Sequence, residues 1–231
     1  MKIDPRLIHV KFLKRYKRFF SDVVLNKKKI TVHCPNSGSM LGLLNEKNDA
    51  WISKSDNPNR KLKFTLEIIN DKKSNVGVNT HRANRIVEEA LNNFQIKELK
   101  KFSLVKREVV FSKETRFDFL LENKNNKAFL EVKNVTLSRK KNISEFPDAV
   151  TSRGKKHLTH LQKAIEFGYQ TYLLFLIQRE DVKIMKIASD IDMDYFNEIK
   201  KAKKKGVKLL AYSCKVKDNE ISINKRIKII I

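Results

Sequence analysis

Residues 116–137, RFDFLLENKNNKAFLEVKNVTL, decide the fold of the second half of this chain. Two apolar runs flank the polar segment NKNNK, a pattern that predicts a β-hairpin. Charged side chains interrupt both runs, with Asp118 in the first and Glu131 and Lys133 in the second. Because side chains alternate between the faces of a strand, Glu131 and Lys133 are expected on one face, and the hairpin can bring Asp118 beside them. The stretch therefore predicts two carboxylates and an amine held together on one sheet.

The rest of residues 80–231 alternates between helical and strand patterns. From Ala83 to Phe94 the apolar residues follow a helical spacing, with Thr80 as the expected N-cap. A second helix is expected to start at Pro147 and Asp148 and to stop at Gly168. Further strands are expected at 102–111, 171–177, 207–214 and 221–231, and a third helix at 194–206. This order predicts an α/β domain with a mixed sheet.

The first half of the chain has a different character. Short apolar stretches with strand character are separated by loops rich in Asn, Ser, Gly and Pro. These stretches lie at residues 9–15, 19–25, 30–34, 50–53 and 62–69. So many short strands in so short a segment predict a small β-barrel. We therefore place a domain boundary near residue 79, with an OB-like barrel at 1–79 and the α/β domain at 80–231.

The chain is strongly basic, because its 231 residues carry a formal net charge of +24 and give a pI of about 10.0. Such a surface favours polyanionic partners such as nucleic acid or anionic membrane. Lysine far outnumbers arginine. AT-rich coding produces the same composition without any selection for binding, so charge alone leaves both explanations open.

Composition also bears on the cellular setting. Cys34 and Cys214 are widely separated and fit neither a zinc motif nor a disulfide framework. The N-terminal segment has no unbroken apolar stretch of the kind a secretory signal needs, and the longest apolar run, 172–177, is far too short to cross a bilayer. We expect a soluble, cytoplasmic protein that does not enter the membrane. The apolar end IKIII fits either a buried strand or a dimer contact, which leaves the oligomeric state open.

The cluster around Glu131 has two interpretations. Two neighbouring carboxylates repel each other, and a divalent cation relieves that repulsion, since Mg²⁺ accepts one or two carboxylates together with water and phosphate oxygens. Asp118 and Glu131 would then hold Mg²⁺ or Mn²⁺, and Lys133 would orient the attacking water or stabilise charge on a phosphodiester. The alternative is an ordinary salt bridge of Lys133 with either carboxylate at a sheet edge.

The order of these elements resembles the core of the PD-(D/E)XK nuclease superfamily, with Phe117-Asp118 in place of Pro-Asp. Six motifs are spread over most of the chain, namely RYKRF (15–19), HCPNSGSM (33–40), NRIVEEAL (84–91), RFDFLL (116–121), EVKNVTL (131–137) and FPDAVTSRGKKHL (146–158). Together they are similar to the motifs of the sugar fermentation stimulation protein A family. The resemblance implies DNA binding, an N-terminal OB-like barrel and a nuclease-like C-terminal domain. It also implies that Asp118 and Glu131 are metal ligands and that Lys133 is the catalytic lysine.

Residues on two expected helices are secondary candidates. Many relatives in the nuclease superfamily carry an acid where Glu89 stands, but its position at the margin of the apolar stripe favours a solvated side chain, so it is only a possible helper. Arg153, His157 and His160 recur at helical spacing and could face a phosphate backbone. Arg153 is the strongest of these, because a guanidinium group matches phosphate geometry.

The N-terminal half offers its own nucleic-acid-binding candidates. Arg15, Lys17 and Arg18 alternate with aromatic residues, as in OB folds that combine a charged groove with stacking side chains. Core packing of the aromatics with solvated basic side chains is the alternative. Asn36 and Ser37 lie in a small-residue turn whose N–H groups could bind a phosphate, and a plain barrel loop explains that turn equally well.

Two functions are therefore weighed. The first is a DNA-binding protein with a Mg²⁺-dependent or Mn²⁺-dependent phosphodiesterase site in its C-terminal domain, acting as an endonuclease or an exonuclease. The second is a non-catalytic DNA-binding regulator on the same scaffold. The family name implies that it would regulate sugar metabolism genes. The intact Asp118, Glu131 and Lys133 set favours the first. Single-stranded DNA, RNA or anionic lipid remain other possible partners.

Overall fold

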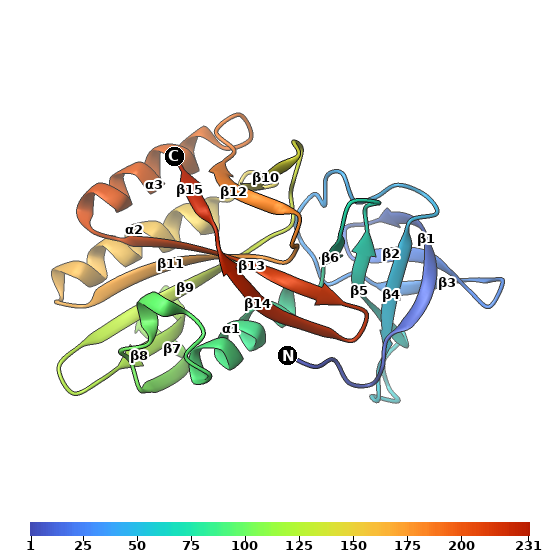
Figure 1. The fold of residues 1–231 in the computed structure, drawn as a ribbon, viewed down its shortest axis with the longest axis horizontal. Helices are drawn as coiled ribbons and strands as arrows, with labels where there is room; N and C mark the ends of the chain where they lie inside the picture. Colours follow the sequence, from blue (N-terminus) through green and yellow to red (C-terminus); the bar gives the residue numbers. More distant parts are fainter.

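The computed structural model describes residues 1–231, which form a β-barrel and an α/β domain that lie side by side (Figure 1). The barrel strands end at Gly77, and a short 3₁₀ helix, η1 (Thr80–Arg82), leads into the α/β domain. The N-terminal segment runs back to the α/β domain, where the Met1 amine donates to the Ile221 carbonyl oxygen at 2.7 Å. None of the helices combines the length and the apolarity that a membrane crossing requires.

The barrel is built from short strands joined by tight turns. Its strands are β1 (Ile8–Tyr16), β2 (Phe20–Leu25), β3 (Lys28–His33), β4 (Asp49–Lys54), β5 (Phe64–Asn70) and β6 (Asn75–Gly77). They pair in the order β3-β2-β1-β4-β5-β6, and β3 also pairs with β5 in parallel at His33 and Thr65. That last pairing closes five strands into a barrel around a core that includes Phe12, Val23 and Leu66. The expected OB-like barrel is confirmed.

The α/β domain is organised around a six-stranded mixed sheet. Its strands and helices are α1 (Ala83–Asn92), η2 (Lys97–Leu99), β7 (Leu104–Ser112), β8 (Thr115–Glu122), β9 (Lys127–Val135), β10 (Asn142–Phe146), α2 (Ser152–Glu166), β11 (Gln170–Ile177), β12 (Val182–Ile187), α3 (Met193–Lys205), β13 (Lys208–Lys217), β14 (Glu220–Arg226) and β15 (Lys228–Ile230). The main sheet has the order β14-β13-β11-β9-β8-β7, in which β9, β11 and β13 are parallel. A smaller parallel sheet has the order β10-β12-β15.

Strand β9 lies in the middle of the main sheet and is covered on both faces. Helix α1 packs on one face, where Leu130 and Val132 join its apolar residues in one core. Helices α2 and α3 pack on the other face, where Phe129 joins Leu158 and Tyr195 in a second core (Figure 1). The alternation predicted for β9 is therefore confirmed. The pairing of β9 with β8 ends at Leu130, so Glu131 and Lys133 lie where β9 pairs only with β11.

Two expected helix starts were wrong. Thr80 does not cap α1, because Asn79 caps the 3₁₀ helix that precedes it and α1 begins only at Ala83. Helix α2 does not start at Pro147, because the chain bends at Asp148 and Ala149 after β10 and Thr151 is the N-cap, accepting from the Gly154 N–H. The expected stop at Gly168 is confirmed, since this residue has a φ of +81° just after α2 ends.

The small sheet was not foreseen. Strands β10 and β12 pair in parallel, and β15 adds to β12, so the chain end IKIII is part of a sheet. The expected final strand at 221–231 is in fact two strands, β14 and β15, which pair in different sheets. These strands are short and carry interrupting polar residues, which is why an apolar pattern could not reveal them.

A buried arginine ties the barrel to the α/β domain. Arg179 follows β11, and only 1% of its side chain is exposed. Its guanidinium group donates to Asp71 in the β5–β6 loop at 2.8 Å and to Asp181 at 2.7 and 2.8 Å. Removing one partner of such a buried pair typically costs about 3–5 kcal/mol. This ion cluster fixes how the barrel lies against the sheet that carries the charged residues.

Candidate functional site

Asp118 occupies the point on β8 where regular pairing with β9 ends. The ladder between the two strands runs from Glu122 opposite Lys127 to Phe119 opposite Leu130. At the next position, the Asp118 carboxylate accepts the Val132 N–H at 2.7 Å through Oδ2. The other oxygen, Oδ1, accepts from the side-chain amide of Asn84 on α1 at 2.8 Å. The carboxylate is thus held between the two strands, where it opens the sheet.

The Asp118 carboxyl group has an unusual proton affinity. Burial raises its pKa to about 6, and the nearby charge of Glu131 adds to this rise. The hydrogen bonds from Val132 and Asn84 act in the opposite direction and are outweighed. Strongly perturbed acids in a cleft are characteristic of functional sites. Because Asp118 accepts the N–H of Val132, the residue after Glu131, it lies beside Glu131, as the hairpin geometry predicted.

Glu131 lies deeper, with only 2% of the residue exposed. Its Oε1 atom accepts from Lys133 Nζ at 2.7 Å and also contacts His157 Nδ1. Its Oε2 atom is buried and has no hydrogen-bond partner. Native proteins rarely leave a buried carboxylate oxygen unsatisfied, because the loss of hydration costs free energy. This atom is therefore a candidate ligand for a cation.

The charge state of Glu131 follows from its neighbours. Burial pushes its pKa upward, but the charge of Lys133 and the contact with His157 outweigh burial and leave the pKa below its ordinary value. Glu131 therefore stays ionised while Asp118 is the carboxyl group of the pair that binds a proton more readily. Two acids with pKa values pushed apart by their surroundings are the pattern expected where their roles differ.

His157 joins this cluster from helix α2. Its Nδ1 atom faces Glu131, and Lys133 Nζ lies 3.4 Å from the same nitrogen. Arg153, one turn earlier, donates from Nε to His157 Nε2 at 3.4 Å. These contacts fit a ring that carries its proton on Nδ1. His157 was predicted as a nucleic-acid contact, and the structure places it beside a predicted metal ligand as well as in the wall of a groove.

A basic groove leads to the cluster. A cavity of about 550 Å³ contains Asp118 and His157 in its wall. Besides Glu108 and Glu114, its wall carries four cationic residues, Lys113, Arg116, Arg153 and Lys156. Such a lining suits a phosphodiester backbone, because positive groups would lie beside the carboxylates. Arg153, which was predicted as a phosphate contact, lies in this wall.

The residues present fit a hard divalent cation. No group of three or more His, Cys, Asp or Glu side chains is arranged so that it could hold a metal ion by itself, so a site formed wholly by the protein is not indicated. Mg²⁺ does not need one, since it keeps several waters and binds through one or two carboxylates plus phosphate oxygens. Oε2 of Glu131 has no partner, and each oxygen of the neighbouring Asp118 carboxylate accepts only one hydrogen bond, so both groups keep lone pairs for such a cation. The Glu131–Lys133 salt bridge that was the alternative interpretation also forms, on the part of β9 that no longer pairs with β8.

Glu89 lies apart from this cluster. Its side chain is 48% exposed and accepts from the Met1 amine at 2.8 Å. The residue of α1 that reaches Asp118 is Asn84. The interpretation of Glu89 as a surface glutamate agrees with this position, whereas Asn84 was missed. The only signal for Asn84 was its place as a polar residue in the first turn of an otherwise apolar-faced helix.

The barrel candidates divide into two groups. Arg15 has internal partners, because its guanidinium donates to the carbonyl oxygens of Asn36, Gly38, Ser39 and Arg18. Asn36 is also internal, with its amide donating to the Val78 carbonyl oxygen. Both residues therefore hold the loop that follows β3. Lys17 and Arg18 are exposed at the tip of the β1–β2 turn, with φ angles of 46° and 62°.

Ser37 belongs to the junction of the two domains. With Asn36 and Gly38 it lines a cavity of about 260 Å³ whose opposite wall includes Asn134, one residue after the predicted catalytic lysine. The approach is close, since the Asp148 carboxylate accepts the Met40 N–H at 3.1 Å and would lie 2.3 Å from a Cβ atom at Gly38. Asp148 therefore anchors the barrel loop, and the first-turn role expected for it in α2 was wrong.

Comparisons with known proteins agree along the whole chain. A family described as "Sugar fermentation stimulation protein RE domain" matches residues 81–220, and one described as "SfsA N-terminal OB domain" matches residues 13–78. A "Sugar fermentation stimulation protein homolog" of Pelagibacter ubique is 55% identical over 100% of this chain and 99% of its own length. Another, from Maricaulis maris, is 39% identical over 99% of this chain and 98% of its own length.

One solved structure has the same fold. It is described as "The structure of Pyrococcus Furiosus SfsA in complex with Ca2+", and it superposes with a TM-score of 0.91 over 100% of this chain and 98% of that chain. The sequence identity is 22%. At that identity the likeness establishes the fold and leaves the chemistry to the residues themselves.

Proposed function

This chain belongs to the sugar fermentation stimulation protein family, and we propose that it is a cytoplasmic DNA-binding protein whose α/β domain is a Mg²⁺-dependent phosphodiesterase of the PD-(D/E)XK type. The observation that carries the proposal is the buried Oε2 atom of Glu131, which has no partner although Asp118 and Lys133 lie beside it. We assign DNA binding mainly to residues 1–79 and hydrolysis to residues 80–231.

Two loops of the barrel support the DNA-binding part. OB folds bind oligonucleotides with their β1–β2 and β4–β5 loops and the strands between them. Here the first of these loops carries the exposed Lys17 and Arg18, and the second carries Arg60, Lys61 and Lys63. With a net charge of +24, electrostatic attraction draws a polyanion to this surface.

The residues of the α/β domain have distinct roles in the proposed reaction. Asp118 and Glu131 would hold Mg²⁺ or Mn²⁺, which when bound supplies Lewis-acid polarisation of a phosphate oxygen and lowers the pKa of water. Lys133 orients the attacking water or stabilises the negative charge that develops on the phosphate. His157 holds the Glu131 carboxylate in place through Oε1, so that Oε2 keeps a fixed direction. Arg153 and Lys156 bind the DNA backbone in the groove.

The Pyrococcus relative supports the metal part of the proposal. That protein is described in complex with Ca²⁺, a hard cation that prefers oxygen ligands as Mg²⁺ does. The same fold therefore accepts a divalent cation in one family member. In this chain the donors would be the carboxylates of Asp118 and Glu131.

A cleavage assay tests the proposal. Purified protein is incubated with labelled single-stranded and double-stranded DNA in the presence of Mg²⁺, Mn²⁺ or EDTA. Asp118→Ala and Lys133→Ala are the test variants, and Glu89→Ala is a matched control for loss of a charged side chain on the same domain. We expect cleavage that needs the metal, is lost in both test variants and is retained in the control, while DNA binding persists in all of them.

A second candidate function is a non-catalytic DNA-binding regulator on the same scaffold. The observation that favours it is that Lys133 and His157 already contact Oε1 of Glu131, so this oxygen has protein partners without any metal. Equal DNA binding by the wild type and the variants, with no cleavage under any metal condition, would support this function and reject hydrolysis.

A further inference from the structure

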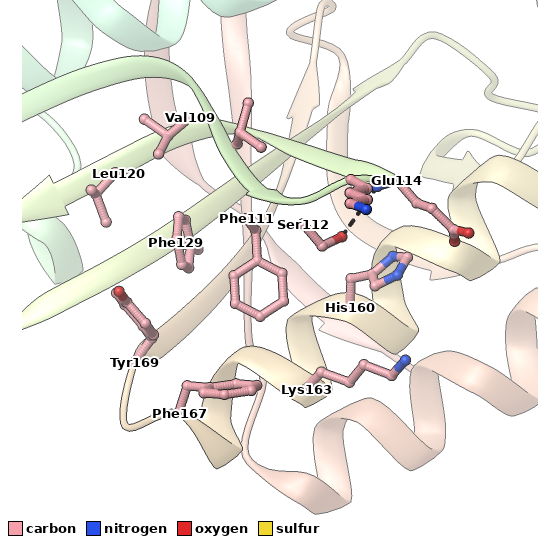
Figure 2. A pocket seen from close by; sticks show the side chains of 12 residues that line it. Val109, Phe111, Ser112, Glu114, Leu120, Phe129, His160, Lys163, Phe167 and Tyr169 are labelled. Carbon is pink, nitrogen blue, oxygen red and sulfur yellow. Dashed lines mark hydrogen bonds between the residues drawn. The ribbon is translucent and has the colours of Figure 1, made fainter.

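An aromatic cavity lies beside the groove that contains Asp118, and the proposed reaction does not use it. It has a volume of about 770 Å³ and is formed by β7, β8, β9 and the C-terminal half of α2 (Figure 2). The rings of Phe111, Phe129, Phe167 and Tyr169 contribute to its wall. A cavity of this size is large enough for a nucleotide and falls in the range of ligand-binding pockets.

The rings form a connected cluster that reaches the surface. Phe111 packs edge-on against Phe129 at 5.4 Å and against Phe167 at 5.9 Å between ring centroids. Phe129 lies against Tyr169 at 4.7 Å. Phe167, just after the end of α2, is nonetheless 72% exposed. A largely exposed ring at the mouth of an aromatic cavity is unfavourable in water, and such a patch usually marks a binding surface.

The other end of the cavity is polar and positively charged. Figure 2 shows His160 and Lys163 of α2 on this side, with Glu114 above them. The His160 ring is held by a hydrogen bond between its Nδ1 and Thr115 Oγ1 at 2.6 Å. Lys163 is exposed. The cavity therefore offers flat apolar faces at one end and hydrogen-bonding groups at the other, which is the combination that a nucleobase requires.

The polar end opens into the groove that contains Asp118. Ser112, Lys113 and Glu114 line both the aromatic cavity and that groove. A ligand could therefore extend from the rings to the carboxylates without leaving the protein surface. The cationic residues along this path match the phosphates of a nucleic-acid strand, whereas an apolar peptide or a lipid tail would gain nothing from them.

We propose that the aromatic cavity binds one unpaired nucleobase of a DNA strand whose phosphodiester lies at Asp118. This inference rests on the proposed function and narrows its substrate to single-stranded or locally unpaired DNA. A base inside a duplex cannot enter the cavity, because it is stacked between its neighbours and must first be taken out of the helix. Stacking on aromatic side chains does not depend on which base is present. The cavity should therefore distinguish unpaired from paired DNA and not one base from another.

A binding measurement tests this inference without catalysis. Fluorescence anisotropy is recorded in EDTA with a labelled single-stranded oligodeoxynucleotide of about 12 nucleotides, within the site sizes typical of such proteins. The blunt duplex and the RNA of the same sequence are measured in parallel. The test variant is Phe167→Ala, because this side chain is 72% exposed and its loss should affect folding little. Phe94→Ala is the matched control, because Phe94 is 50% exposed at the end of α1, outside the cavity.

We expect Phe167→Ala to bind the single strand about tenfold more weakly than wild type and the duplex equally well. Phe94→Ala should match the wild type on both. Replacing single bases by abasic sites should weaken wild-type binding at one position along the strand, and Phe167→Ala should no longer respond at that position.

Several results would overturn the inference. They are unchanged single-strand binding by Phe167→Ala, an equal loss on duplex DNA, an abasic effect that persists in the variant, or binding of RNA alone. If the wild type cleaves DNA with Mg²⁺ but Phe167→Ala behaves as the wild type, only the cavity assignment fails. If the wild type binds no DNA, the proposed function itself is wrong.

Discussion

Two buried glutamates, one in each half of the molecule, have opposite surroundings. Glu67 on β5 of the barrel is 1% exposed, and both of its oxygens are satisfied. Ser53 donates to Oε1 at 2.7 Å, Asn79 donates to Oε2 at 2.9 Å, and the Arg82 guanidinium donates to both. Glu131 on β9 is 2% exposed, but only Oε1 has partners.

The difference separates a structural carboxylate from one with capacity to bind a ligand. Glu67 has no free lone pair for another group, and its contacts join the barrel to the segment that leads into α1. Glu131 keeps a buried oxygen directed at no protein donor. Burial of a carboxylate is therefore a poor guide to function by itself, whereas the number of its unsatisfied oxygens is informative.

The largest effect is expected for Glu131→Gln. The amide keeps the size of the side chain but removes the charge that would bind the metal, so DNA cleavage should fall about 1000-fold, or about 4 kcal/mol in the activation free energy. Cleavage rates of folded protein, checked by circular dichroism, measure this. Glu67→Gln is the control and should cleave at the wild-type rate per folded molecule. Wild-type activity in Glu131→Gln would rule out Glu131 as a metal ligand.

Glu67→Gln should instead lower stability. The substitution leaves the Arg82 guanidinium, which is mostly buried, without its counter-charge, so we expect a loss of about 3 kcal/mol in the free energy of unfolding. Urea titration followed by circular dichroism gives this value. A loss as small as that of an exposed pair, about 0.5 kcal/mol, would show that the four contacts of Glu67 contribute little.

Metal binding should depend on pH through Asp118. Burial first, and then the charge of Glu131, raise the pKa of this carboxyl group to about 6, so it is protonated below that pH and must lose its proton to act as a ligand. The apparent Mn²⁺ affinity should therefore fall by up to about tenfold per pH unit below 6 and level off above 7. Isothermal titration calorimetry with Mn²⁺ measures this affinity at about pH 5, 6 and 7.5, values chosen to lie below, at and above the pKa of Asp118. An affinity that is flat over this range would exclude Asp118 from the metal site.

The smallest effect is expected at the barrel. Replacing Lys17 and Arg18 by Asn removes two charges while keeping residues that tolerate the positive φ of this turn. DNA affinity should fall about fivefold, and the dependence of log Kd on log salt concentration should decrease by about 2. The same change at Lys203 and Lys204, near the end of α3, is the control. An unchanged salt dependence would place the DNA elsewhere on the surface.

The strand pattern of residues 116–137 was sufficient to predict the faces of the central hairpin. An alternation with a period of two residues admits only one assignment once one face must be apolar. Leu130 and Val132 did fall on the α1 side, and Phe129 on the α2 side. The expected proximity of Asp118 to Glu131 followed from the length of the connecting turn.

Local sequence was a weaker guide to irregular segments. Pro147 and Asp148 have the residue types of a helix start, yet they lie in a non-helical segment before α2, where Asp148 accepts the Met40 N–H of the barrel. Strands β10 and β12 went unrecognised because each is completed only by pairing with the other. In these places tertiary contacts outweigh the preference of the local sequence.

The sequence by itself determined the two-part organisation, the positive charge and the carboxylates with their lysine on one sheet, because these depend on composition and on the short periods of strands and helices. The tertiary structure alone decided which groups complete the cluster. His157 reaches Glu131 from α2 and Asn84 reaches Asp118 from α1, across separations of 26 and 34 residues. Only the packing of both helices on the sheet brings these side chains together, and that packing leaves one oxygen of Glu131 without a partner.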